Sequence, residues 1–191
     1  IDDESISHNG MLIEFDKLCL NLPTADLTTK IQLLNNIIFE SSRAKSDYIV
    51  LHSGAVQSNE GVTLFLGETT SGKSTLVYYL VNNGYNYVSD DIVPISVVNN
   101  TAEIIGNPIH LRSDSINVLK SYGVANELNY CEDIDRFIYQ PLIKSNTNNK
   151  VNSICIINRG HKNNVSILSK AEIFRTLLIN SKTKYIDIST V

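Results

Sequence analysis

The chain has 191 residues, of which 42% are hydrophobic, and this is enough for the core of one globular domain. Its formal net charge is −4 and its pI is about 5.5, so it lacks the overall positive charge with which proteins bind nucleic acids or acidic membranes. No apolar run approaches the roughly 18 residues of a membrane-spanning helix. We therefore expect a single domain over residues 1–191 that has neither a nucleic-acid nor a membrane partner.

The cysteine pattern indicates a reducing compartment. The three cysteines, Cys19, Cys131 and Cys155, are far apart and odd in number, so they form neither a metal-binding spacing nor a disulfide framework. The cytoplasm is the simplest location, and the sequence contains no recognisable signal peptide. The chain starts at Ile1 and stops within the strand-like residues 187–191, so we expect further residues at both ends.

Short runs rich in apolar and β-branched residues predict strands along the whole chain. The expected strands are residues 11–22 (as one strand or two), 48–52, 55–57, 62–66, 85–89, 92–98, 102–105, 151–158 and 165–168. Residues 58–61 are a turn signal, so residues 48–66 are expected to form a hairpin. Pro94 suggests that its strand is irregular or lies at a sheet edge, because proline cannot donate to a β ladder.

Apolar residues at helical spacing predict four helices. These are residues 28–42, 75–81, 113–121 and 169–180. Gly84 and Gly123 are expected to end the second and third helices, and Ser113 or Asp114 to cap the start of the third. The apolar face of the last helix is expected to consist of Ala171, Phe174, Leu177 and Leu178. The polar residues 145–150 predict a mobile loop.

Residues 67–74, with the sequence GETTSGKS, fit the phosphate-binding pattern G-x-x-x-x-G-K-[ST] at every fixed position. In this motif, successive backbone N–H groups form a concave anion site, and the following helix adds the positive end of its dipole. The lysine provides an ammonium group for the outer phosphates, and the serine hydroxyl can bind Mg²⁺. The predicted strand before the motif and the predicted helix after it are the flanks that this motif requires, whereas the alternative is a Gly/Ser-rich turn that fits by chance. The expected nucleotide-binding residues are Gly67, Glu68, Thr69, Thr70, Ser71, Gly72, Lys73, Ser74 and Thr75.

Two adjacent carboxylates, Asp90 and Asp91, end the strand that is predicted directly after the helix of the motif. Phosphoryl transfer needs Mg²⁺ to offset developing charge and a residue that orients or deprotonates the attacking oxygen. One carboxylate can bind the metal while the other faces the acceptor hydroxyl, and their mutual repulsion raises one pKa, which suits a general base. The alternative is a solvated turn or the cap of a short helix. The position of the pair, one helix after the motif, favours the catalytic interpretation.

Three segments together resemble the catalytic domain of the bacterial HPr kinase/phosphorylase family. They are H-x-G at residues 52–54, the motif at residues 67–74, and V-S-D-D at residues 88–91, in the family's order and with no gap needed between the lysine and the first aspartate. The combination of G-K-S-T with S-D-D is most similar to the smaller HPr-kinase-like proteins of gene clusters that modify ribosomally made peptides. The resemblance is strongest over residues 48–112.

The resemblance implies an α/β fold of the phosphoenolpyruvate-carboxykinase-like P-loop type, with a mixed, strand-rich sheet around one phosphate-loop helix. Residues 1–47 would form an N-terminal strand and helix portion, residues 48–112 the nucleotide-binding core, and residues 113–191 a truncated portion on the substrate side. The family is bacterial and cytoplasmic and assembles into hexamers, so a homo-oligomer is expected from the resemblance alone.

The resemblance also implies transfer of phosphate from ATP, with Mg²⁺, to a serine hydroxyl of a peptide or small protein. Asp90 would be the acid/base, Asp91 would lie close to the metal and the phosphate, Ser74 would bind Mg²⁺, and Lys73 would bind the phosphates. The family's E-x-R-G-x-G signature is represented only by E-I-I-G at residues 103–106, so Glu103 is a second candidate metal ligand, or else an exposed strand residue. The missing arginine and second glycine leave open both a phosphorylase activity and HPr as the substrate.

Other polar residues are secondary candidates. His52 could orient Asp90 or contact phosphate, or it could be a satisfied structural group. Arg112 and Arg159 could each reach the transferring phosphate or the substrate, or lie at the surface. His110 and His161 are expected to be ordinary surface residues. Four tyrosines are expected to serve in packing and not in base stacking, because no basic stripe accompanies them: Tyr78, Tyr79, Tyr85 and Tyr87.

The sequence thus predicts a serine kinase whose leading acceptor is a ribosomal peptide precursor. Three alternatives remain: a nucleotide-binding regulator that does not phosphorylate, an HPr-directed kinase/phosphorylase, and a small-molecule kinase. A peptide kinase needs an open groove near Asp90, whereas a small-molecule kinase needs a closed apolar pocket there. In a regulator, the aspartate pair would be a structural cap.

Overall fold

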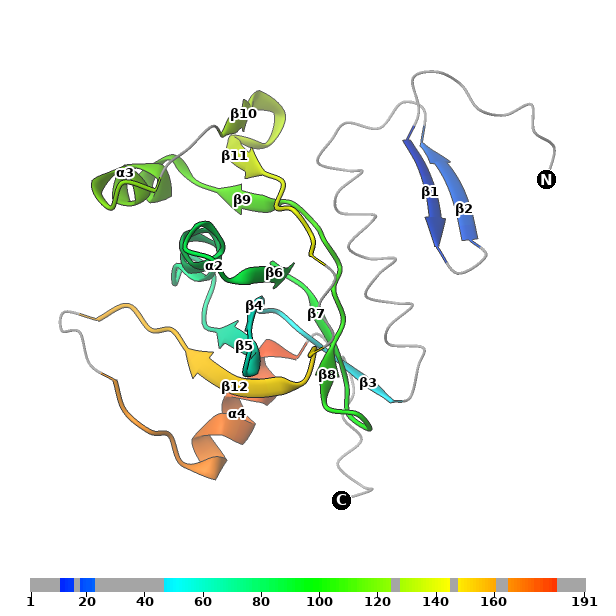
Figure 1. The fold of residues 1–191 in the computed structure, drawn as a ribbon, viewed down its shortest axis with the longest axis vertical. Helices are drawn as coiled ribbons and strands as arrows, with labels where there is room; N and C mark the ends of the chain where they lie inside the picture. The colour runs from blue at the N-terminus through cyan, green and yellow to red at the C-terminus, as the bar shows by residue number, and fades with distance from the viewer. Residues whose placement is uncertain are drawn as a thin grey trace.

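The computed structural model of the protein describes residues 11–15, 18–22, 47–124, 128–144, 148–160 and 165–181 (Figure 1). Within these residues the architecture is α/β, with mixed sheets and three α-helices, as expected from the sequence at the level of fold class. The expected helix at 28–42, the residues 145–147 of the expected loop, His161 and the strand-like residues 187–191 lie outside the described residues. The strand pair at the N-terminus is confirmed as an antiparallel hairpin of β1 (Met11–Phe15) and β2 (Leu18–Leu22).

A four-stranded sheet in the order β12-β5-β4-β6 forms the centre of the described part. Its strands are β4 (Gly54–Ser58), β5 (Gly61–Leu66), β6 (Asn86–Ser89) and β12 (Val151–Ile156). Strand β4 is antiparallel to both β5 and β6, and β12 is parallel to β5, so β5, β6 and β12 all run in the same direction. The segments that follow these three strands therefore emerge at one edge of the sheet, where β4 also begins.

The turn of the predicted hairpin is confirmed, but the hairpin does not include residues 48–51. Ser58 pairs with Gly61, and β4 and β5 form the hairpin. Strand β3 (Tyr48–Leu51) instead joins a separate three-stranded sheet with β7 (Val93–Ser96) and β8 (Thr101–Ala102). The hydrogen-bonding partner of β3 therefore comes from residues more than forty positions away, and no local pattern reveals that pairing.

Pro94 lies in the central strand of this three-stranded sheet, so its expected edge position is wrong. The carbonyl of Pro94 accepts a hydrogen bond from Glu103 N (2.9 Å), on the side where β8 pairs only with Ile95 and Ser96. In an antiparallel strand, the N–H and C=O of one residue point to the same side. The side on which Pro94 lacks an N–H is therefore the side of β8, at a position beyond the end of that short strand. The strand expected at 102–105 is accordingly reduced to Thr101–Ala102.

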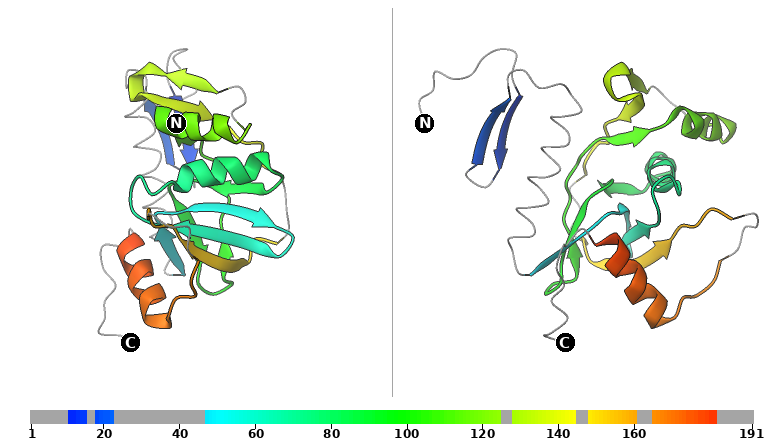
Figure 2. Two further views of the ribbon diagram at one scale, coloured as in Figure 1. Left: turned by 90° about the vertical axis from the view of Figure 1, so that its left-hand side faces the viewer. Right: turned by 180° about the vertical axis from the view of Figure 1, so that it is seen from behind.

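Helix α2 (Lys73–Asn82) and helix α4 (Lys170–Asn180) cover opposite faces of the central sheet (Figure 2). The α2 face is packed through a buried cluster that includes Val56, Phe65, Val77 and Tyr78. The opposite face buries alternate residues of the same strands, and Leu177 of α4 packs against them. This alternation is the period of two that a sheet with two covered faces requires. Gly84 follows α2 with a φ of 96°, which confirms it as the end of that helix.

Helix α3 (Ser113–Ser121) lies beyond α2, next to a three-stranded sheet in the order β10-β11-β9 (Figure 1). These strands are β9 (Ile109–Leu111), β10 (Asn129–Cys131) and β11 (Arg136–Tyr139). Arg112 occupies the N-cap position of α3, so the expected cap at Ser113 or Asp114 is wrong by one or two residues. In the first turn of the helix, the Asp114 carboxylate accepts a hydrogen bond from Ser115 N (2.9 Å). Gly123 follows the helix with a φ of 70°, as expected.

The C-terminal part departs most from the sequence-based expectations. Residues 165–168 form no strand, and Val165 and Ile167 are fully exposed. Helix α4 begins at the predicted place, because Ser169 forms a capping box with Glu172. The apolar face of α4 is mostly exposed, since Phe174 is 62% exposed and Leu177 is the residue of this face that packs against the core.

The tyrosines and cysteines largely follow the expectations. Tyr78 and Tyr87 are completely buried in the core, as predicted for packing residues. Tyr79 packs at its edge, whereas Tyr85 is 41% exposed. Among the described side chains, Cys131 and Cys155 carry free thiols.

Candidate functional site

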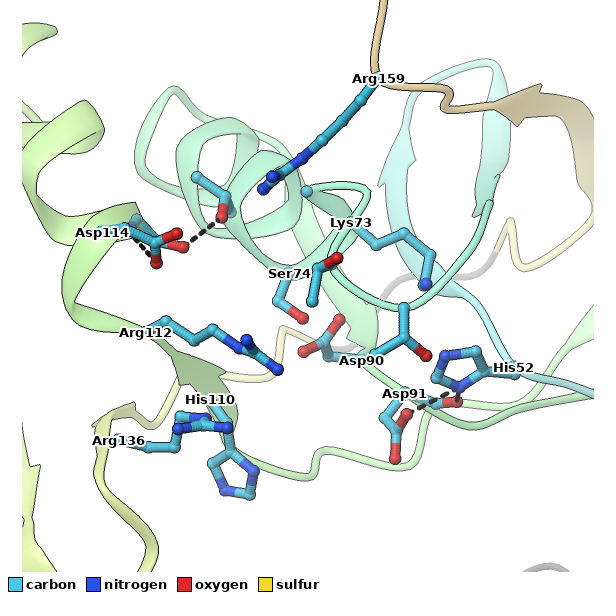
Figure 3. A pocket seen from close by; sticks show the side chains of 15 residues that line it. His52, Lys73, Ser74, Asp90, Asp91, His110, Arg112, Asp114, Arg136 and Arg159 are labelled. Atoms are coloured by element: carbon cyan, nitrogen blue, oxygen red, sulfur yellow. Dashed lines mark hydrogen bonds and ion pairs between the residues drawn. The ribbon is translucent and has the colours of Figure 1, made fainter.

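A cavity of about 340 Å³ lies at the edge of the central sheet where β5, β6 and β12 end and β4 begins (Figure 3). Residues 67–74 follow β5, the aspartate pair follows β6, and Arg159 follows β12. The lining residues are polar, charged or glycine: His52, Thr69, Thr70, Gly72, Lys73, Ser74, Thr75, Asp90, Asp91, His110, Arg112, Asp114, Ser115, Arg136 and Arg159. The fold thus brings the motif and the aspartate pair together, although sixteen residues separate Ser74 from Asp91.

The loop of residues 67–74 turns through backbone conformations that its glycines permit. Gly67 has a φ of 151° and Gly72 a φ of 106°, and Thr70 between them also has a positive φ of 69°. A Cβ at Gly67 would lie 2.5 Å from Ile157 O, because the loop passes directly over the end of β12. Alternation of positive and negative φ directs successive N–H groups to one side of the chain, which is the geometry of an anion-binding nest.

Lys73, the first residue of α2, is 7% exposed and folds back over the loop. Its Nζ donates to Gly67 O (2.8 Å) and Glu68 O (3.0 Å), so the ammonium closes the loop from inside. Burial lowers the pKa of Lys73, whereas the charges of Asp90 and Asp91 raise it. The ammonium is therefore held within the cavity and partly stripped of water, which strengthens its attraction for an anion.

Asp90 is 3% exposed and lies beside Ser74 and Lys73 in the cavity. Burial is the largest effect on its carboxyl and raises its pKa to about 6; the Ser74 hydroxyl, which hydrogen-bonds to it, acts in the opposite direction, and the charge of Asp91 raises the pKa further. Its Oδ1 is buried without a hydrogen-bond partner. An unpartnered carboxylate oxygen at this depth is costly unless a ligand supplies the missing contact.

Gly54 provides the space in which the Asp90 carboxyl lies. A Cβ at Gly54 would come within 3.3 Å of Asp90 Oδ1 and within 2.5 Å of Val77 Cγ2, in the middle of the core under α2. The backbone of β4 therefore approaches both the helix and the carboxyl more closely than any residue with a side chain would allow. This close approach explains the glycine of the H-x-G segment.

Replacing Gly54 with alanine is expected to destabilise the protein by about 1–3 kcal/mol, because the new methyl group overpacks the core against Val77. Urea denaturation measures this free energy of unfolding. If the clash is the cause, the double variant Gly54→Ala/Val77→Ala will lose less stability than the sum of the two single variants. Strict additivity of the two losses would refute the steric explanation.

His52 contacts Asp91 and not Asp90, so its expected role in orienting Asp90 is not what the structure shows. His52 Nδ1 lies 2.8 Å from Asp91 Oδ1 and 3.0 Å from Asp91 O. Both atoms are acceptors, so Nδ1 is the ring nitrogen that carries the proton. Asp91 adopts a φ of 72°, which is rare for a residue with a side chain, and His52 holds it in this conformation.

Asn107 is a structural partner of the aspartate pair that the sequence analysis missed. Its Oδ1 accepts from the Tyr87 hydroxyl (3.0 Å), the Ser89 hydroxyl (3.0 Å) and Asp90 N (3.3 Å), and its Nδ2 donates to Asp90 O. The side chain thus holds the end of β6 in register with the segment before β9. Its position next to Gly106 and Pro108 is only a turn signal in the sequence, so no local pattern connects it to the site.

Three arginine side chains line the cavity. Arg112 follows β9 and points toward Asp90, and Arg136 begins β11, beside it in the same sheet (Figure 3). Arg159, from the end of β12, extends toward the loop and α2. Arg136 was not predicted as a site residue, because nothing in its sequence neighbourhood suggests a site. In the structure its Nη1 donates to Asp135 O (2.6 Å).

His110 is more than the ordinary surface residue that the sequence predicted. Its Nε2 is buried without a hydrogen-bond partner, and it lines the cavity next to Arg136. Burial lowers its pKa, and the Arg136 charge acts in the same direction, whereas Asp91 raises the pKa. A neutral imidazole therefore lies on the wall opposite the loop.

Glu103 is not among the residues that line the cavity. Its Oε1 accepts the Tyr48 hydroxyl (2.6 Å), and this hydrogen bond raises the pKa of Tyr48. The structure therefore brings Ser74 and Asp91 of the expected metal ligands to the site, together with Asp90, and leaves Glu103 outside it.

The residues at the cavity suit a phosphate-bound Mg²⁺ better than a metal held by protein alone. Within the described residues, no group of three or more His, Cys, Asp or Glu side chains could hold an ion. Mg²⁺ in phosphate sites takes only one or two protein oxygens and completes its shell with phosphate oxygens and water. The Ser74 hydroxyl and the Asp91 carboxylate, which both line the cavity, are oxygen donors of this kind.

Among the described residues, no helix combines the length and apolarity needed to cross a membrane. Comparison of the chain with models of known protein families and with curated protein sequences gave no match.

Proposed function

We propose that the protein is an ATP- and Mg²⁺-dependent kinase of the HPr-kinase-like type, with a P-loop fold, that transfers phosphate to a serine hydroxyl of a peptide or small protein. One observation carries the proposal: the buried carboxyl of Asp90, with an unpartnered Oδ1, shares one cavity with Lys73 and Ser74. A phosphate loop alone indicates that a protein binds a nucleotide, but it does not indicate which reaction, if any, follows. A buried carboxyl beside it supplies the base that phosphate transfer to a hydroxyl needs.

The residues divide the reaction between them. The N–H groups of residues 67–75 and the Lys73 ammonium hold the triphosphate, and Ser74 with a carboxylate would hold the Mg²⁺, which offsets charge on the outer phosphates when bound. The acceptor oxygen then bonds to the γ-phosphorus as the bond from that phosphorus to the β–γ bridging oxygen breaks. Asp90 takes the hydroxyl proton, and ADP is the leaving group. With a pKa of about 6, Asp90 is ionised at neutral pH and basic enough to accept this proton.

The walls of the cavity favour a polar acceptor over a small apolar one. No apolar side chain of the described residues lines it, and three arginines border it: Arg112, Arg136 and Arg159. A small-molecule kinase would enclose its acceptor in an apolar pocket near the base. Guanidinium groups around a polar cavity instead suit a peptide segment whose backbone and anionic groups they can bind.

Mass spectrometry of candidate precursor peptides incubated with the protein, ATP and Mg²⁺ tests the proposal. We expect one phosphate to be added to a serine, and the addition to be lost when Lys73 is replaced by alanine or when the metal is chelated. ATP binding without phosphorylation of any peptide would point to the alternative of a non-catalytic regulator. Absence of ATP binding in the unaltered protein would reject both functions.

A further inference from the structure

A second cavity of about 520 Å³ lies in the groove between helices α2 and α3. Its walls are mainly apolar and aromatic, unlike those of the first cavity: Leu76 and Tyr79 come from α2, and Val118 and Leu119 come from α3, with Tyr122 directly after it. A pocket of this size, with apolar walls and a few polar groups, has the character of a small-molecule site.

The groove continues the first cavity. The two share five lining residues: Gly72, Thr75, Asp114, Ser115 and Arg159. The Thr75 hydroxyl donates to Ser115 Oγ (3.0 Å), so the boundary between the cavities is a fixed contact between the two helices. Thr75 directly follows Ser74 in the first turn of α2, so the boundary lies next to the helix N-terminus at which an anion would bind.

The groove presents aromatic surface that no other described side chain covers completely. The Tyr79 and Tyr122 rings meet edge to face at 5.9 Å, yet Tyr122 is 68% exposed and Val118 is 50% exposed. Leu119, which is 1% exposed, forms the floor. A flat aromatic ligand between these side chains would bury apolar area on both of its faces, which is the main source of affinity for an unpaired base.

We propose that this groove binds the base and ribose of the nucleotide whose triphosphate lies in the first cavity. This assignment rests on the proposed function and adds the site that distinguishes a nucleoside triphosphate from a bare polyphosphate. The base packs against Tyr79, Tyr122 and Val118. The ribose lies at the boundary, where the Asp114 carboxylate and the Ser115 hydroxyl are within the shared lining and can accept hydrogen bonds from sugar hydroxyls.

Titration calorimetry with two probes, Mg·ATP and Mg·tripolyphosphate, tests the assignment. Tyr122→Ala and Val118→Asn both change exposed positions, so the fold should tolerate them. Each is expected to weaken ATP binding by about tenfold, because apolar contact area with the base is lost, and to leave tripolyphosphate binding unchanged. Tyr85→Ala is the matched control, since Tyr85 is an exposed tyrosine beyond the other end of α2 and lines neither cavity.

The outcomes separate this inference from the proposed function. If ATP affinity is unchanged in both groove variants while the unaltered protein binds ATP and tripolyphosphate, the groove holds something else, such as the acceptor, and the inference is overturned although the kinase proposal stands. An equal loss for both probes would also overturn it, because the variants would then have disturbed the phosphate loop. If neither probe binds the unaltered protein, both proposals fail.

Discussion

Replacing Asp90 with asparagine is expected to lower the rate of phosphate transfer by about 10²–10⁴ while leaving nucleotide affinity within a few fold. Asparagine keeps the size of the side chain and can still bond to Ser74, so the loop keeps its geometry. It cannot accept the proton of an acceptor hydroxyl. The loss should therefore appear in kcat and not in the affinity for ATP.

The measurement compares kcat and the Kd for Mg·ATP in the variant and the unaltered protein. Glu60→Gln is the matched control, because Glu60 is an exposed carboxylate in the β4–β5 turn and does not line the cavity. Normal turnover by the Asp90 variant would remove this residue from the mechanism. A loss of ATP binding in parallel with turnover would instead show that Asp90 acts on the nucleotide or its metal.

The same substitution is expected to change how stability depends on pH. In the unaltered protein, burial raises the pKa of Asp90 from 3.8 to about 6, so the folded state holds this proton more tightly than the unfolded state. Its contribution to stability is fully present below pH 3.8 and is lost as the pH rises to about 6. The shift corresponds to roughly 3 kcal/mol, which the charged carboxylate costs the folded protein above that range.

Asp90→Asn removes this titration. Urea denaturation without nucleotide measures the free energy of unfolding of the variant and of the unaltered protein. The difference between them, variant minus unaltered protein, should be larger at pH 8 than at pH 4 by up to about 3 kcal/mol. Glu60→Gln should follow the unaltered protein across the range. A difference between Asp90→Asn and the unaltered protein that does not vary with pH would mean that the carboxyl is not protonated preferentially in the folded state.

Asp90 thus combines its proposed catalytic role with a cost to the stability of the folded protein. A carboxyl with an unpartnered oxygen at 3% exposure is maintained at the cost of stability, which is typical of catalytic positions. The aspartate after it is arranged differently. The Asp91 carboxylate contacts the His52 ring, and the backbone of Asp91 is strained. Its side chain is also more exposed than that of Asp90.

The local features of the site could be predicted from the sequence. The motif of residues 67–74 specifies a loop between a strand and a helix through its glycines and its lysine, and the structure places it there. The strand that ends at Ser89, before the aspartate pair, and the turn at residues 58–61 were predicted for the same reason. Each depends on interactions between residues close in the chain, for which the side-chain pattern is sufficient.

The tertiary structure decided which of the candidates meet. Asn107 and Arg136 reach the site from segments with no sequence signal, whereas Glu103, which the family signature suggested, pairs with Tyr48. Helix α4 has the apolar spacing of a buried helix, yet most of its apolar face is left exposed. Such contacts depend on strand pairings between residues far apart in the chain, whose energies come from packing and not from local conformation.

The sequence by itself therefore determined the phosphate-binding motif and the presence of two carboxylates one helix later. Only the fold decided that these carboxylates have different environments. Strands β5 and β6 run in the same direction on either side of β4, so the loop and the aspartate pair emerge side by side. Gly54 then leaves space for Asp90 to be buried, while His52 holds Asp91 toward solvent, because the start of β4 lies at the same edge of the sheet.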